Sequence, residues 1–341
     1  MKETRYSRQE LFSPIGNIGQ EKFKNKHVLI IGAGALGSSS AEMLVRSGIG
    51  TITIVDRDYV EYSNLQRQQL YTEEDVERRL PKAVAAQRRL QQVNTDVNIK
   101  GIISDVSIDE LETLIVGVDV IVDATDNFET RLMINDISQK YSVPWVFGSC
   151  VGSYGMSYTF IPNVTPCFHC LLENIPTKGM TCDTVGVIAP VVTMVSSYQV
   201  TEVMKLLIGD MKSIRKTLVT FDLWNNQRMD INMDGAKKTT CLSCGVDATY
   251  PYLQKENISQ SVVLCGRNTV QIRPAKHRQE LDLHYIEEQL RESGKKVDRN
   301  IYLLITEIDN HRVVLFQDGR MLVHDTKDTS FARKVYQQLL G

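Results

Sequence analysis

The stretch Gly32-Ala33-Gly34-Ala35-Leu36-Gly37 decides the fold of this 341-residue chain. It follows a continuous apolar run at 27–31, which predicts a buried parallel strand, and it precedes a helical pattern at 38–46. Gly32 allows a tight turn, Gly34 lets a phosphate or ribose approach the backbone, and Gly37 lets the helix pack closely on the strand. The N-terminus of that helix offers N–H groups to an anion. The sequence therefore predicts a nucleotide-binding βαβ unit.

An acidic residue completes this nucleotide motif. Asp56 follows the second predicted strand, 51–55, and stands about twenty residues beyond Gly34, where a carboxylate accepts hydrogen bonds from ribose hydroxyls. An NAD-dependent oxidoreductase would share the glycines and this acid, so that class of enzyme remains an alternative.

Strand and helix patterns alternate through the first half of the chain. We expect strands at 97–103, 118–123 and 145–149, and helices at 7–24, 72–93 with a break at Pro81, 107–116 and 128–140. This alternation predicts a Rossmann-like α/β domain, a mostly parallel sheet with helices on both faces. Segments 152–160, 218–222 and 229–233 predict an antiparallel extension, and 187–208 a long apolar helix.

The composition shifts near 246–258, which predicts two domains. Residues 1–250 would form the nucleotide-binding domain, and 255–341 a small α/β C-terminal module of unknown role. In that module we expect strands at 262–272, 302–307, 313–316 and 321–323, and helices at 281–293 and 331–340.

Charge and hydropathy narrow the class of protein. The net charge is −2 with no basic run, which argues against nucleic-acid binding. We find no apolar run of membrane-spanning length, and the polar start Met1-Lys2-Glu3-Thr4-Arg5 is not a signal peptide, so we expect a cytoplasmic protein without a membrane partner.

Two cations follow the nucleotide motif. Arg67 lies in Ser63-Asn64-Leu65-Gln66-Arg67-Gln68, and Lys82 follows Pro81 at a predicted helix start. Both could be solvated surface charges. Beside a nucleotide loop they could instead clamp a triphosphate and offset the charge that grows during attack at phosphorus.

Asp126 follows the predicted strand at 118–122. Because ligands bind at the carboxyl ends of parallel strands, Asp126 is placed to hold Mg²⁺ on the phosphates. The alternative is that Asp126 or Asn127 caps the next helix.

The cysteines point to a metal. Cys167, Cys170, Cys241 and Cys244 form two Cys-x-x-Cys pairs, which predict a closed, structural zinc site rather than redox pairs or free thiols. We expect His169 to be a bystander, Cys150 to serve packing and Cys265 to be structural. Cys182, in a loop, could be a nucleophile or sulfur acceptor, or simply a small buried residue.

Together these motifs resemble the MoeB/ThiF family of ubiquitin-activating-type enzymes over residues 5–245. The resemblance rests on Arg5-Tyr6-Ser7-Arg8-Gln9, the glycine loop, Asp56, Ser63–Gln68, Pro81-Lys82, Ala124-Thr125-Asp126-Asn127 and the cysteine pairs. It implies that the enzyme adenylates the C-terminal glycine of a ubiquitin-like sulfur carrier protein with ATP and Mg²⁺.

The resemblance also implies roles for single residues. It puts Asp56 on the ribose, Asn64, Arg67 and Lys82 around the triphosphate, and Asp126 on magnesium. A further implied residue, Arg8, would reach the nucleotide of a neighbouring subunit in a homodimer, and Cys182 would correspond to a loop cysteine linked to sulfur handling.

Two features depart from the family pattern. Arg79-Leu80 stands where the family often has a glycine before Pro81-Lys82, which bears on the shape of that loop. Residues 255–341 are too few for the rhodanese domain of extended relatives, so we assign no sulfurtransferase activity to them.

The expected reaction is attack of the carrier carboxylate on the α-phosphate of MgATP, which gives an acyl-adenylate and pyrophosphate for later sulfur transfer. We slightly favour a molybdopterin-synthase small subunit (MoaD-like) over a thiamine-pathway carrier (ThiS-like) as the substrate; both end in Gly-Gly. A cysteine desulfurase or rhodanese is a possible sulfur donor. A non-catalytic scaffold that binds a ubiquitin-like protein, and a superfamily member that modifies tRNA or a small peptide, are further alternatives.

Overall fold

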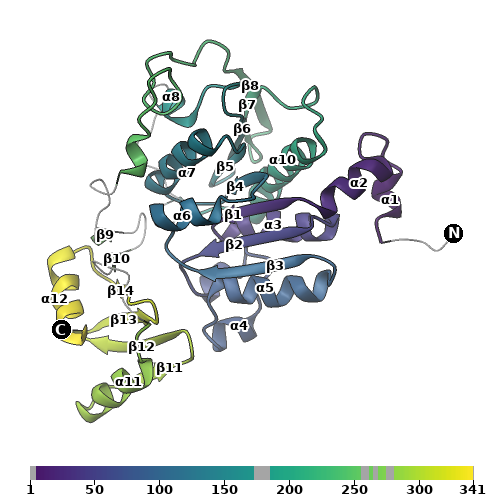
Figure 1. Cartoon of the computed structure of the whole chain (residues 1–341). Helices are drawn as coiled ribbons and strands as arrows, with labels where there is room; N and C mark the ends of the chain where they lie inside the picture. Colours follow the sequence, from purple (N-terminus) through teal and green to yellow (C-terminus); the bar gives the residue numbers. More distant parts are fainter. Residues whose placement is uncertain (1–4, 173–184, 255–260, 264–267, 274–279, 341) are drawn as a thin grey trace. The chain divides into compact units, whose positions relative to one another are not determined.

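The computed structural model describes residues 5–172, 185–254, 261–263, 268–273 and 280–340, and it divides into two compact units, Met1–Lys255 and Glu256–Gly341 (Figure 1).

An eight-stranded sheet forms the centre of the first unit. Its order is β3 (Asn98–Ile103), β2 (Thr51–Asp56), β1 (His27–Ile31), β4 (Val120–Asp123), β5 (Trp145–Val151), β6 (Tyr154–Phe160), β7 (Thr217–Asp222) and β8 (Gln227–Asn232). Strands from β3 to β5 run parallel, and β6 to β8 are antiparallel. This is the Rossmann-like sheet with an antiparallel extension that the sequence predicts.

Helices cover this sheet in two groups. One group packs α10 (Ala189–Ile208) on α3 (Ala35–Ser47), and α3 on α5 (Lys82–Val93). In the other, α6 (Ile108–Leu114) packs on α7 (Phe128–Tyr141), and α7 on β4 (Figure 1). The shorter helices are α1 (Ser7–Glu10), α2 (Gly16–Lys24), α4 (Glu73–Glu77), α8 (Phe168–Leu172) and the 3-10 turn η1 (Tyr62–Asn64).

The register of β1 aligns three strand ends at one edge of the sheet. Ile31 pairs with Val55 of β2 on one side and with Asp123 of β4 on the other. The residues that follow these strands therefore come together, although Gly32, Asp56 and Ala124 are far apart in the sequence. The reversal of strand order between β1 and β4 is the position where open α/β sheets bind ligands.

The segment 72–93 forms two helices, with the break at Pro81 that the sequence predicts. Pro81, with an extended backbone, precedes the first residue of α5, and α4 ends earlier at Glu77. Arg79 takes a left-handed conformation with φ 50°, the region that glycine adopts without strain. Arg79 thus adopts a backbone conformation that glycine favours, in the loop where the family resemblance leads us to expect a glycine.

From the sequence we expect no apolar run of membrane-spanning length, but the helix α10 is such a run. It has 20 residues and is apolar enough to cross a membrane by length and composition, but half of that stretch is buried inside the structure. Because α10 packs on α3, β5 and β6, its apolar surface serves the core of the first unit.

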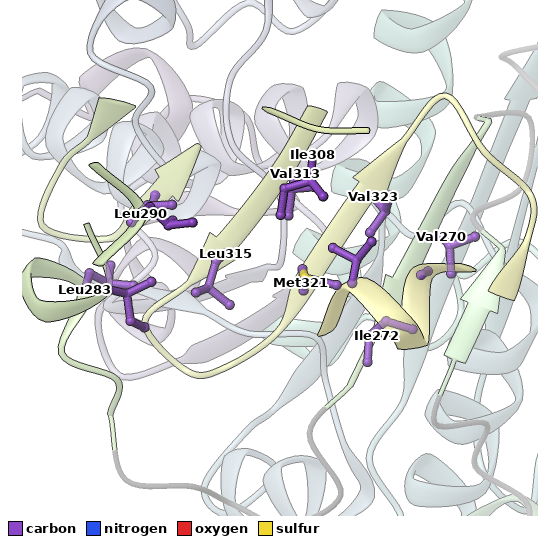
Figure 2. Close-up of a cluster of buried hydrophobic side chains, with 13 residues drawn as sticks. Val270, Ile272, Leu283, Leu290, Ile308, Val313, Leu315, Met321 and Val323 are labelled. Atoms are coloured by element: carbon purple, nitrogen blue, oxygen red, sulfur yellow. The ribbon is translucent and has the colours of Figure 1, made fainter. Parts of the chain in front are cut away.

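The second unit has its own sheet and core. The strand order is β11 (Val297–Arg299), β12 (Leu303–Ile308), β13 (His311–Phe316), β14 (Met321–His324), β10 (Thr269–Ile272) and β9 (Ser261–Val263), all antiparallel. Alternate residues of the strands pack against α11 (Leu283–Glu292) and α12 (Thr329–Leu340). Figure 2 shows this core with Val270, Leu283, Leu290, Val313, Leu315 and Val323 among its members.

Two details of the second unit differ from the sequence expectation. The single strand expected at 262–272 is two strands, β9 and β10, which pair with each other. The short strand β11 was not expected, because its three residues carry only one apolar side chain, Val297.

Candidate functional site

Packing requires two of the three motif glycines. A Cβ on Gly32, whose φ is 98°, would collide with the carbonyl oxygen of Ala124, and a Cβ on Gly37 would collide with that of Gly32. The position above Gly34 is open by contrast. Apart from its chain neighbours, Nε2 of Gln68 is the one heavy atom of the described residues within 4 Å of a Cβ built there, at 3.9 Å. The loop therefore leaves room for a ligand at Gly34, as the nucleotide interpretation expects.

Asp56 lies against this loop and is buried. Its carboxylate accepts hydrogen bonds from the N–H groups of Ala33 and of Asp58, the latter at 2.7 Å. Burial raises the pKa of Asp56, while the positive charge of Lys82 acts in the opposite direction. Asp56 thus joins the end of β2 to the glycine loop.

Lys82 is not a solvated surface charge. Its side chain is 3% exposed, and its Nζ lies 3.3 Å from Oδ2 of Asp58. The backbone N–H of Lys82 also donates to the carbonyl oxygen of Asp58 at 2.9 Å. The start of α5 is therefore fixed to the segment after β2, and the ammonium group is held by a neighbouring carboxylate.

The loop after β2 holds Asn64 and Arg67. Asn64 is buried, and its Oδ1 accepts the N–H of Glu61 at 3.1 Å in a capping box of η1. Arg67 is half-buried, and its Nη1 donates to the carbonyl oxygen of Ser63 at 2.8 Å. The amide oxygen of Asn64 thus serves the loop itself, and its Nδ2 makes a long contact of 3.5 Å with Oγ of Ser63.

Of the two residues that could cap the helix after β4, Asn127 is the one that does so. Asn127 caps α7, since its Oδ1 accepts the N–H of Thr130 at 2.8 Å. The Asp126 side chain is 63% exposed, and its Oδ1 lies 3.7 Å from Nη2 of Arg57. An exposed carboxylate at the end of β4 has the donor chemistry that Mg²⁺ prefers.

Arg57 was not singled out by the sequence analysis. Its guanidinium pairs with Asp105 at 3.1 Å as well as with Asp126. Burial opposes the charge of Arg57, but the carboxylates of Asp105 and Asp126 outweigh that effect and raise its pKa. A permanent positive charge therefore stands beside Asp126.

Arg131 was also missed, and it holds the loop that carries Asp126. Its Nε pairs with Asp123 at 3.0 Å, and its Nη2 donates to the carbonyl oxygen of Thr125 at 2.8 Å. Asp123 in turn accepts the N–H of Thr125 at 2.9 Å. No local sequence signal identifies this clamp, because the pairing depends on α7 folding back over the end of β4.

Arg8 lies elsewhere in its own chain. It is exposed on α1, and Tyr6 nearby packs against Gly48 and accepts a hydrogen bond from Asn94. Gly48 and Asn94 precede β2 and β3, so this arm lies at the amino ends of those strands, opposite the glycine loop.

The four predicted cysteine ligands converge. The Sγ atoms of Cys167, Cys170, Cys241 and Cys244 all lie within 4.8 Å of one another. The separations of 3.8, 3.6 and 3.5 Å between neighbouring Sγ atoms approach the edge of a tetrahedron with Zn–S bonds of about 2.3 Å. The arrangement is consistent with zinc.

His169 is not part of this sulfur cluster. Its Nδ1 lies 2.9 Å from Oγ of Ser243, so it connects the two cysteine pairs through hydrogen bonding. Cys150 is buried in the cluster around α10, in keeping with a packing role. Cys182 and Cys265 lie outside the described residues.

Comparison with known proteins places this site in a family. The sequence profile of the ThiF family matches residues 6–243. The chain belongs to the ThiF family. Its expected membership of the MoeB/ThiF group is thereby confirmed.

Two curated relatives of this ThiF-family chain are adenylyltransferases by name. The sulfur carrier protein ThiS adenylyltransferase of Bacillus subtilis is 50% identical over 337 residues, which cover 99% of both chains. The molybdopterin-synthase adenylyltransferase of Haemophilus influenzae is 32% identical over 222 residues, which cover 64% of this chain and 90% of the relative. The chain is an enzyme of the adenylyltransferase class.

Solved structures agree on the fold. A crystal structure of E. coli MccB with ATP superposes with a TM-score of 0.61 at 23% identity, and the match covers 72% of this chain and 75% of MccB.

We predict that metal removal destabilises the ThiF-family domain. Cys170→Ser, or treatment with a strong chelator, should abolish stoichiometric zinc in elemental analysis, because a closed four-thiolate site needs every ligand. A loss of about 3 kcal/mol in unfolding free energy would lower the melting temperature by roughly 10 °C. Cys150→Ala, outside the cluster, is the control and should keep its zinc. A zinc-free wild-type protein with an unchanged melting temperature would contradict the assignment.

Proposed function

We propose that this ThiF-family enzyme uses MgATP to adenylate the C-terminal glycine of a ThiS-like sulfur carrier. The main support is the relationship to the B. subtilis ThiS adenylyltransferase, which extends through the second unit at 50% identity. The H. influenzae relative matches a smaller part of this chain at lower identity. The slight preference for a MoaD-like carrier is therefore not confirmed, and the comparisons favour the thiamine-pathway alternative.

The geometry supports attack at the α-phosphate. The carrier carboxylate is already ionised at neutral pH, so the step needs positioning and charge neutralisation rather than a general base. In this proposal Asp56 holds the ribose, Gly34 admits the phosphates, and Asp126 binds Mg²⁺, which would neutralise phosphate charge when bound. Arg67 and Lys82 offset the charge that develops as pyrophosphate leaves.

The other classes explain less of the structure. An oxidoreductase would leave Lys82, which is held beside the nucleotide loop, without a role. A non-catalytic scaffold predicts loss of the phosphate-binding residues, whereas Arg67, Lys82 and Asp126 are all present.

The enzyme should also be a homodimer. Arg8 lies at the edge of the sheet opposite its own glycine loop, and exposed Leu11, Phe12 and Ile18 stand on the same arm. Such an apolar arm suits burial against a second copy, and this placement supports Arg8 acting at the partner's nucleotide.

Carrier-dependent exchange of labelled pyrophosphate into ATP tests the reaction. We expect exchange with a ThiS-like carrier ending in Gly-Gly, and little with a MoaD-like carrier. Lys82→Met should lower the rate by about a hundredfold, because a positive charge at the phosphates is lost. Lys140→Met removes a surface pair with Glu112 and is the matched control, with the wild-type rate expected. If neither a ThiS-like nor a MoaD-like carrier supports exchange, the proposal is refuted.

Mixing two weakened variants tests the shared site. Arg8→Ala and Lys82→Met homodimers should each keep only residual exchange activity, because each lacks one cation at every nucleotide. Co-refolded or co-expressed heterodimers contain one site with both cations intact, so part of the exchange activity should return. If mixed dimers form and are no more active than their parents, Arg8 does not act across the interface.

A further inference from the structure

A buried amide beside the nucleotide loop carries an acceptor that no described residue satisfies. Gln68 is 3% exposed, and its Oε1 has no hydrogen-bond partner within the described part of the chain. The Nε2 atom of the same side chain is the atom closest to the open position at Gly34, at 3.9 Å from a Cβ built there.

The backbone fixes this side chain in place. The N–H of Gln68 donates to the carbonyl oxygen of Asn64 at 3.0 Å, and the carbonyl oxygen of Gln68 accepts the N–H of Tyr71 at 3.2 Å. Tyr71 in turn donates its hydroxyl proton to the carbonyl oxygen of Ala33 at 2.6 Å. Burial raises the pKa of Tyr71 well above its ordinary value, so this donor keeps its proton. The turn that carries Gln68 is thus tied to the glycine loop.

Buried side-chain oxygens in proteins are almost always hydrogen-bonded. The unsatisfied oxygen of Gln68 belongs to a carboxamide whose Nε2 lies at the open position of Gly34, so a ligand bound there can supply the missing donor. We propose that the Gln68 carboxamide hydrogen-bonds the bound nucleotide beside Gly34 and positions it for attack. This inference rests on the proposed use of ATP.

The chemistry of ATP matches a carboxamide at this point. Ribose hydroxyls can donate to Oε1, and phosphate oxygens can accept from Nε2, so one side chain satisfies both kinds of group. Asn64, the amide expected at the triphosphate, differs from Gln68 because its Oδ1 already accepts the N–H of Glu61. Of the two buried amides in this loop, Gln68 is consequently the one whose acceptor is left for the nucleotide.

Two substitutions separate nucleotide binding from a purely structural role. Gln68→Met keeps the volume but removes both polar atoms. It should raise the KM for ATP about tenfold with a smaller change in kcat, and leave the melting temperature of the nucleotide-free protein unchanged or higher. Gln68→Glu places a carboxylate near the phosphates and should raise the KM further.

Gln87→Met is the matched control. Gln87 uses its Oε1 to accept the N–H of Gly101 at 3.0 Å, so its loss should lower the melting temperature and leave the KM for ATP unchanged. A Gln68→Met protein with the wild-type KM for ATP would overturn the inference, whatever its melting temperature.

The rise in melting temperature on addition of ATP measures nucleotide binding by Gln68 variants without any carrier protein. The wild type should show this rise and Gln68→Met should lose most of it. If no carrier supports exchange but this difference remains, the proposed reaction fails while the role of Gln68 stands. An equal rise in both proteins overturns the role of Gln68 alone, and no rise in the wild type overturns both.

Discussion

Two backbone hydrogen bonds at the carboxyl end of β1 determine where everything else in the site can lie. The N–H of Gly32 donates to Val55 of β2 at 2.8 Å, and the N–H of Ala124 donates to Ile31 at 2.9 Å. They hold three strand ends in register, so the glycine turn, the acid after β2 and the loop that carries Asp126 meet at one edge. The close approach of Gly32 to the Ala124 carbonyl leaves no room for a side chain there.

Around this edge the protein holds its positive charges with carboxylates. Lys82 pairs with Asp58, Arg57 pairs with Asp105 and Asp126, and Arg131 pairs with Asp123. A cation that is already fixed and partly buried needs little rearrangement when a triphosphate arrives, which is the condition under which such groups stabilise developing charge most. Two of these pairs also hold backbone segments in place. Arg131 fixes the loop before Asp126, and the contact between Lys82 and Asp58 fixes the start of α5.

Much of the fold and of the candidate site could be predicted from the sequence, because the motifs that determine them are local. The glycine loop, the apolar strand before it, Asp56 and Pro81 each act through their nearest neighbours, and the structure has the Rossmann-like sheet that they predict. The cysteine pairs were recognisable by spacing alone. Arg57 and Arg131 were not, since their partners come from other strands and loops. Gln68 belongs to the quoted motif, but the sequence could not show that its Oε1 would be buried without a partner among the described residues. The split of 262–272 into β9 and β10 was missed because apolar residues on both sides of the break give a continuous pattern.

The fate of the phosphorus atoms tests the central claim most directly. The wild-type enzyme can be incubated with a ThiS-like carrier and ATP labelled either on the α-phosphate or on the γ-phosphate, and the products separated. Attack at the α-phosphate predicts that the α label appears as AMP attached to the carrier carboxylate and the γ label appears in pyrophosphate. Release of ADP with transfer of the γ label, or recovery of an unmodified carrier with intact ATP, would contradict it.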